Sequence, residues 1–246
     1  MSATTYRTET HYGATVHIIR TTPGNIQMKL IQKSIWDSFG DFGINANFFG
    51  NTLSNIYGIA INGNTPVGSW ANDYGSHNGP YFDVEMKRAT LVCYSGGTLT
   101  VTDPPVHYYT EIPNFTNIVW AVGGGDLFLR DSSITDWTKL RDKLAAEPRK
   151  WRWDEVLSGS SDRGRSGIGY DLNNNVYLFG VSNETGFQGV TMFEFRDIAS
   201  RIGCHKAIFL DGGGSAQLSW SDGVELYGHG GITRRPVPTI VKLKAL

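Results

Sequence analysis

The chain consists mostly of short runs of apolar residues separated by glycine-rich or polar breaks. Runs of about four to eight residues rich in β-branched and aromatic side chains are typical of β-strands. Two such runs, Ala14–Arg20 and Ile26–Ile31, flank a Pro-Gly turn and predict a β-hairpin. We expect further strands at Tyr57–Ile61, Ala89–Tyr94, Thr98–Val101, Ile118–Val122, Asp126–Leu129, Val176–Val181, Ala207–Leu210 and Thr239–Leu243. The pattern predicts a protein that is mainly sheet.

Helical periodicity is sparse. Between Thr191 and Ile202 the apolar residues share one helical face, Thr191 and Glu194 have the spacing of a capping box, and Gly203 is suited to end the helix. A second helix is expected over Asp136–Ala146, because the residue before Pro148 disfavours helical geometry. We therefore expect a single domain that covers residues 1–246 and consists mainly of sheet, with a few helices.

Composition narrows the function classes. The sequence has 246 residues, of which 40% are hydrophobic and 18% charged, enough apolar volume for a sizeable core. With 22 Lys and Arg against 23 Asp and Glu, there is no positive excess, so neither nucleic acid nor a membrane surface is an expected partner. The start of the chain lacks the apolar segment of a secretory signal, which predicts a cytoplasmic protein. The oligomeric state is left open.

Cysteines and metal-ligand motifs give little sign of a cofactor. Cys93 and Cys204 are far apart in the sequence and are expected to be buried thiols. There is no H-x-x-x-H motif, Cys/His cluster or calcium-loop motif, so we expect neither a metal nor another cofactor. A weak calcium site made from carbonyls and scattered Asp residues would not be detected in this way.

One loop combines an acid with a run of glycines. The expected strand Ala207–Leu210 leads into Asp211, and Gly212, Gly213, Gly214 and Ser215 follow. Consecutive backbone N–H groups without bulky side chains favour anion binding beside the carboxylate. The loop lacks the lysine of a P-loop and the last glycine of a nucleophile elbow. The alternative is a tight strand connection in which Asp211 caps its own turn.

Three further places carry candidate binding groups. Asn45 and Asn47, just before Phe49, would point to the same side of an extended segment and could hold sugar hydroxyls or phosphate oxygens; alternatively they stabilise a loop. Arg165 opens an expected hairpin that continues into Val176–Val181, and Arg235 lies in a glycine-flexed loop with His229. Guanidinium groups grip phosphate bidentately, although such arginines are often solvated charges and a lone histidine is usually structural.

Seven segments occur together in an order that resembles the phosphodiester glycosidase family: Gly43–Phe49, Ile59–Gly63, Ala121–Leu127, Arg165–Gly169, Gly189–Glu194, Leu210–Ser215 and Arg235–Val237. The resemblance implies an α+β fold with a mixed β-sheet core and a few helices, in which the segments around Asn45, Arg165, Asp211 and Arg235 meet at a pocket. It also implies hydrolysis of a linkage between a sugar C1 and a phosphate oxygen.

The resemblance lets the residues be assigned roles. Asp211 would be the catalytic carboxylate, and Arg165, Arg235 and the N–H groups of residues 212–215 would hold phosphate, while Asn45 and Asn47 orient hydroxyls. The chain departs from the family at Asn47, where a smaller residue is usual, and at Ser166, where threonine is usual. The expected partner is a small sugar-phosphodiester or nucleotide-like molecule.

Two other functions remain open. A protein with the same fold could bind a sugar phosphate or nucleotide-like molecule without cleaving it. An enzyme acting on a sugar-phosphate polymer would need an open groove lined by aromatic residues, for which the candidates are Trp70, Tyr74, Trp151 and Trp153. These aromatic residues are otherwise expected in the core.

Overall fold

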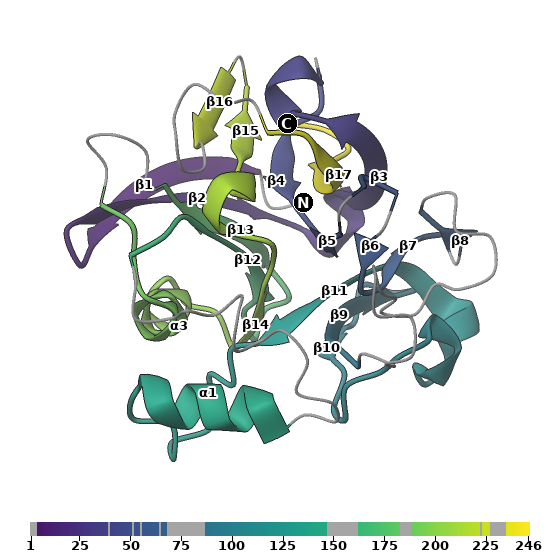
Figure 1. Ribbon diagram of the computed structural model, residues 1–246. Coiled ribbons are helices and arrows are strands. Elements are labelled where there is room, and N and C mark those ends of the chain that lie inside the picture. Colours follow the sequence, from purple (N-terminus) through teal and green to yellow (C-terminus); the bar gives the residue numbers. More distant parts are fainter. Residues whose placement is uncertain are drawn as a thin grey trace.

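The computed structural model describes residues 4–38, 40–50, 52–54, 56–63, 65–67, 87–146, 162–182, 188–221, 223–226 and 235–246. Its described strands form a large ten-stranded sheet, a five-stranded sheet and a two-stranded ribbon (Figure 1). The large sheet has the order β1 (Thr5–His11), β2 (Ala14–Thr21), β13 (Val176–Val181), β12 (Arg165–Tyr170), β14 (Lys206–Phe209), β11 (Ile118–Asp126), β7 (Ala60–Asn62) and β8 (Thr65–Pro66), with β9 (Ala89–Tyr94) and β10 (Leu99–Val101) joined to it through β11.

The five-stranded sheet has the order β16 (Gly223–Leu226), β15 (Leu218–Trp220), β4 (Gly43–Asn45), β17 (Val237–Leu243) and β3 (Ile26–Lys33), and the ribbon pairs β5 (Phe48–Phe49) with β6 (Ile56–Tyr57). The described helices are α1 (Trp137–Ala146) and α3 (Met192–Arg201), with short 3-10 turns η1 (Pro23–Asn25), η2 (Ile35–Asp37), η3 (Tyr109–Glu111), η4 (Phe115–Asn117) and η5 (Gly213–Ser215). This confirms the expected α+β class. Every pairing between the described strands is antiparallel, so the sheets they form are not the expected mixture of parallel and antiparallel pairs.

The large sheet has a different apolar layer on each face because side chains alternate along a strand. Ile18 of β2 packs with Phe195 and Ile198 of α3 in one cluster. The next residue, Ile19, belongs to the cluster that also holds Ile44 of the five-stranded sheet. The helices therefore cover one face of the large sheet and the smaller sheet covers the other, as Figure 1 shows.

Locally encoded elements agree with the sequence. Thr191 Oγ1 accepts the Glu194 N–H at 3.2 Å and Glu194 Oε2 accepts the Thr191 N–H at 2.8 Å, so the expected capping box is present on α3. Gly203 follows this helix with φ +102°. The strands β12 and β13 pair as the predicted hairpin, and α1 begins within one residue of its predicted start. Both cysteines are buried thiols, as expected.

The hairpin predicted across the Pro-Gly turn is wrong. β2 pairs with β1 and β13, whereas β3 pairs with β17 in the other sheet. The turn η1 carries the chain from one sheet to the other, and the Trp120 indole N–H donates to the Pro23 carbonyl at 2.9 Å to hold it there. A Pro-Gly signal predicts a change of direction, but it does not choose the strand that pairs next.

Two other strand boundaries also differ from prediction. The strand expected at Asp126–Leu129 does not exist, because β11 runs through the glycines to Asp126 and the chain then turns at Phe128, which has φ +46°. Within this strand the position of Gly125 requires glycine, because a Cβ there would lie 2.0 Å from the Phe209 ring. The expected strand Tyr57–Ile61 is divided at Gly58, where φ is +111°. Strand β1 was not predicted.

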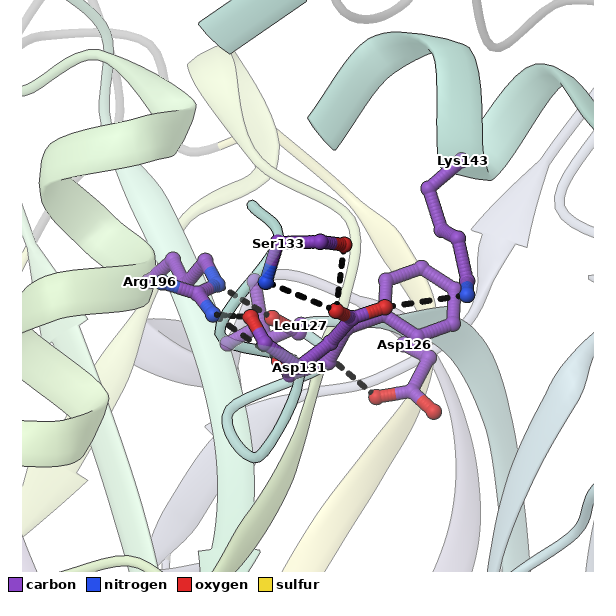
Figure 2. Close-up of polar contacts among 7 residues, drawn as sticks. Asp126, Leu127, Asp131, Ser133, Lys143 and Arg196 are labelled. Atoms are coloured by element: carbon purple, nitrogen blue, oxygen red, sulfur yellow. Dashed lines mark hydrogen bonds and ion pairs between the residues drawn. The ribbon is translucent and has the colours of Figure 1, made fainter. Parts of the chain in front are cut away.

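The loop after β11 is held by both helices (Figure 2). Arg196 of α3 donates to the carbonyl oxygens of Leu127 and Asp131 at 2.9 and 3.0 Å. The Asp131 carboxylate accepts from Lys143 of α1 at 2.9 Å and from the Ser133 N–H at 3.0 Å. These bonds fix α1 to α3 on the helical face. Neither α1 nor α3, the α-helices of the described ranges, has the length and apolar character that a bilayer crossing requires.

Candidate functional site

The triple-glycine loop lies where the large and small sheets meet. After β14, the Leu210 N–H donates to the Ser166 carbonyl at 2.8 Å and the Asp211 N–H donates to the Ala46 carbonyl at 3.0 Å. The Gly213 N–H donates to the Gly164 carbonyl at 2.8 Å. The loop is therefore bonded both to the start of β12 and to the end of β4. These bonds join the Asp211 segment to two of the other segments that the resemblance implied would meet, those around Asn45 and Arg165.

Asp211 places a carboxyl group at this meeting point of the two sheets, which we call the corner. Desolvation raises the pKa of Asp211 to about 6, against the opposing effects of the Ser215 hydroxyl, the positive charge of Arg235 and the Gly212 N–H. Ser215 Oγ is fully buried and makes no hydrogen bond of standard geometry within the described residues, so its influence on Asp211 comes from proximity. A carboxyl group with this pKa changes its charge close to neutral pH.

The glycines allow the backbone conformation and the close packing of this loop. A Cβ on Gly212 would lie 2.8 Å from the Gly164 carbonyl oxygen, and Gly213 has φ +57°. Of the four N–H groups expected to bind an anion, those of Gly213 and Ser215 already donate to the carbonyls of Gly164 and Gly212. The loop closes on itself as a 3-10 turn, and this accounts for part of the glycine content without a ligand.

Asn45 ties three strands together at this corner. Its Nδ2 donates to the Asp211 carbonyl at 2.7 Å, and its Oδ1 accepts from the Ser166 hydroxyl at 2.7 Å and from the Gln217 N–H at 2.9 Å. The side chain is 1% exposed. These contacts favour a role for Asn45 in holding the carboxylate segment in place.

Asn47 is similarly enclosed. Its Nδ2 donates to the carbonyls of Ile59 and Gly123 at 3.1 and 3.4 Å, and its Oδ1 accepts from the Thr239 hydroxyl at 2.9 Å. The side chain thus connects the residues between β4 and β5 to three other segments. The proposed contact of either asparagine with substrate hydroxyls stays a prediction, and in both cases the observed partners are protein groups.

Arg165 is a buried cation at the start of β12. It is 4% exposed, and its Nε donates to the Val190 carbonyl at 3.1 Å. Burial and the nearby Arg163 lower the pKa of Arg165 to about 10, with Asp162 acting in the opposite direction, so the guanidinium stays charged at neutral pH. The segment can pack this closely because residue 189 is glycine: a Cβ there would lie 2.5 Å from the Arg163 nitrogen.

Arg235 approaches the loop from the other side. Its guanidinium carbon lies 5.2 Å from the centroid of the Phe49 ring, a cation–π distance. An ideal Cβ placed on Gly214 would lie 3.3 Å from an Arg235 guanidinium nitrogen. Phe49 therefore contacts the arginine and supports its side chain. His229 and the aromatic residues considered for a polymer groove, Trp70, Tyr74, Trp151 and Trp153, lie outside the described residues.

Gln217 is a site residue that the sequence reasoning missed. It is 4% exposed and contacts both the Asn45 and the Arg235 segments. It stands between the apolar Ala216 and Leu218, so alternation along a strand would direct its side chain toward solvent. A buried polar residue in such a run has no local signal, because its partners come from distant segments.

In the ranges that the structure describes, no three His, Cys, Asp or Glu side chains are grouped so that they could hold a metal ion. The Asp211 loop combines a carboxyl group with the guanidinium of Arg235 and hydrogen-bonding neighbours, whereas the contact described for the Arg165 side chain is to the Val190 carbonyl. Such a set is suited to an anionic substrate whose reaction develops positive charge next to a departing phosphate.

Solved structures with a similar fold are known. The catalytic domain of zebrafish N-acetylglucosamine-1-phosphodiester alpha-N-acetylglucosaminidase, auto-inhibited by its pro-peptide, matches with a TM-score of 0.67 and 14% identity, over 99% of this chain and 83% of that one. A hypothetical protein from Synechocystis matches with a TM-score of 0.56 and 13% identity, over 97% of this chain and 61% of that one. At such identities the likeness shows the fold.

Sequence comparison gives the family. Residues 41–243 match the phosphodiester glycosidase family, and the chain belongs to it. Human N-acetylglucosamine-1-phosphodiester alpha-N-acetylglucosaminidase is 25% identical over 101 residues, which are 41% of this chain and 18% of the human protein. The chain thus matches less than a fifth of the length of this curated relative.

Proposed function

We propose that the protein hydrolyses the bond between a sugar C1 and a phosphodiester oxygen, with Asp211 as the catalytic carboxylate. The observation that carries this proposal is the Asp211 carboxyl group, desolvated to a pKa of about 6 and close enough to Arg235 to sense its charge. Membership of the phosphodiester glycosidase family and the substrate printed in the name of the human relative support the same bond type.

In the proposed reaction, opposite charges develop on the sugar and on the phosphate, and different residues stabilise each. As the phosphate leaves, positive charge develops on the sugar ring and negative charge on the phosphate. Asp211 in its ionised form stabilises the charge at C1 or bonds to it, and Arg165 and Arg235 hold the departing phosphate. In either case a water molecule supplies the oxygen that ends on C1, displaces any bond to Asp211, and releases its second proton to solvent. A phosphodiester is already a good leaving group, so the proposal needs no second carboxylate.

A turnover assay with a matched control tests this proposal. The purified chain is incubated with α- and β-linked sugar 1-phosphodiesters and with sugar nucleotides, starting with N-acetylglucosamine 1-phosphodiesters, and release of free sugar is followed by mass spectrometry. We expect Asp211→Asn to lose at least about 10²-fold in turnover while still binding substrate. Asp142→Asn, at a carboxylate that is 62% exposed on α1, is the control. Near-normal hydrolysis by the Asp211 variant removes this residue from the mechanism.

The same assay separates the two other functions. Stoichiometric binding without product would identify a binding protein for a sugar phosphate or nucleotide-like molecule. Turnover of a sugar-phosphate polymer in preference to small diesters would identify an enzyme of surface polysaccharides. The sugar released in this assay identifies the sugar of the substrate. Retention or inversion at C1 and the predicted cytoplasmic location need measurements of their own.

A further inference from the structure

Both ends of the Gln217 side-chain amide are bonded to protein. Oε1 accepts from the Ser34 hydroxyl at 2.9 Å and from the Ile35 N–H at 3.0 Å, at the start of η2. Nε2 donates to the Arg235 carbonyl at 2.8 Å. A buried primary amide with partners at both ends has a fixed orientation, because turning it over would place donors against donors.

The backbone of Gln217 is bonded to Asn45, which contacts the Asp211 segment. Its N–H donates to Asn45 Oδ1 at 2.9 Å, and its carbonyl accepts the Asn45 N–H at 3.0 Å. Asn45 in turn donates to the Asp211 carbonyl at 2.7 Å. A single residue therefore connects the segment that carries the catalytic carboxylate to the segment that carries Arg235.

The hydrogen bond from Gln217 fixes the main chain at Arg235. The residue is exposed, and its guanidinium rests on the Phe49 ring. Phe49 supports the end of the side chain, whereas Gln217 holds the main chain from which that side chain extends. An exposed arginine with a free backbone would lose much rotamer and backbone entropy on gripping a phosphate, and a fixed backbone lowers that cost.

We propose that Gln217 is a positioning residue, which acts through Arg235 to place its guanidinium relative to the Asp211 carboxyl group for binding the phosphate of the substrate. The inference rests on the proposed function, since it assigns phosphate binding to Arg235. It goes beyond that proposal by naming the residue that joins the cation to the carboxylate.

The test compares variants that remove the hydrogen bonds made by different ends of the Gln217 amide. Gln217→Glu keeps an oxygen for Ser34 and Ile35 but loses the donor to Arg235. Ser34→Ala removes a bond at the other end and leaves the Arg235 bond intact. We expect Gln217→Glu to raise KM for the phosphodiester, and Kd for inorganic phosphate measured by calorimetry, by about tenfold, the scale of one hydrogen bond, with a smaller change in kcat. Ser34→Ala should change both constants by less than about threefold.

A double-mutant cycle separates positioning from general stability. In an Arg235→Ala background, Gln217→Glu should weaken phosphate binding by less than about twofold, because the residue through which it acts is gone. A full tenfold effect in that background, or no effect in the native background, overturns the inference. Gln217→Met, which fills the same space with neither a donor nor a charge, is tested in the same cycle whether or not Gln217→Glu folds. The same result is expected, and where the two variants differ the methionine variant decides, because the glutamate also repels phosphate through its own charge.

Phosphate binding also distinguishes this inference from the proposed function. A wild-type protein that binds phosphate but cleaves no sugar phosphodiester, and in which Gln217→Glu weakens that binding through Arg235, would refute the proposed hydrolysis and support the positioning role. A wild-type protein that hydrolyses the diester and is insensitive to Gln217→Glu would refute the positioning role alone. If the wild type neither binds phosphate nor cleaves the diester, both fall.

Discussion

The side-chain nitrogen of Asn45 lies 2.7 Å from the main-chain oxygen of Asp211, and this bond joins residues that are 166 positions apart in the sequence. The same amide accepts from Ser166 and from Gln217, so it holds β4, β12 and the segment before β15 against the carboxylate loop. The position of the acid is therefore set by a buried hydrogen-bond network.

Replacing this amide should cost stability as well as activity. Asn45→Ala would leave the Asp211 carbonyl, the Ser166 hydroxyl and the Gln217 N–H without their partner, and each orphaned buried group costs about 1 to 3 kcal/mol. We expect the free energy of unfolding in urea to fall by at least about 2 kcal/mol. Asn173→Ala, at an exposed residue of the turn after β12, is the control. Equal stability of the two variants would show that the network is not important for folding.

The pH dependence of catalysis should report the ionisation of Asp211. Its pKa is raised to about 6, so the carboxylate form proposed for catalysis is lost below that pH. We expect kcat/KM to rise with pH through about 6 and to level off above it, and this limb should be absent from the residual activity of Asp211→Asn. A rate that instead falls as pH rises through 6 would mean that Asp211 acts in its protonated form.

The same shift predicts a pH-dependent change in stability. Because the folded pKa lies above the unfolded value near 3.8, the folded state binds the proton more tightly, and the contribution of Asp211 to wild-type stability declines as pH rises from about 4 to about 6. Asp211→Asn lacks this ionisation. The difference in Tm between variant and wild type should therefore shift in favour of the variant over this interval and stay constant at higher pH. A difference in Tm that does not vary with pH would contradict the raised pKa.

Arg165 should not tolerate lysine. The buried guanidinium donates through Nε to the Val190 carbonyl, and a lysine keeps the charge but loses this bond and the planar fork. We expect Arg165→Lys to raise KM for a phosphodiester by about 10- to 100-fold, measured in the assay described above. Arg141→Lys on α1, where the arginine is 45% exposed, should be neutral. Similar kinetics for the two variants would argue against a phosphate contact at Arg165.

The two thiols should be inert in the folded protein. Burial raises the pKa of Cys93 to about 11, and it also raises the pKa of Cys204. Since the thiolate is the reactive form, we expect negligible reaction with a thiol-specific disulfide reagent at pH 8, and two equivalents of reaction after denaturation. Rapid labelling of the native protein would show that one of these cysteines is accessible.

Features that depend on neighbours along the chain could be predicted from the sequence. The capping box of α3 and the hairpin of β12 and β13 each rest on residues within a few positions of one another, so their hydrogen bonds are local. The order of the motifs also identified the family and implied which distant segments meet. The specific roles of the residues at the site remain proposals.

Tertiary structure alone decided which partners the polar groups find. The sequence predicted that β2 and β3 pair, and the fold places them in different sheets, since a turn signal carries no information on strands elsewhere in the chain. The sequence left open whether Asn45 and Asn47 bind hydroxyls of a ligand or stabilise a loop, and the fold brings carbonyls and hydroxyls from distant segments to both amides. Gln217 had no local signal at all. A buried amide must satisfy its donors and acceptors, but the groups that satisfy them become neighbours only when strands far apart in sequence are paired.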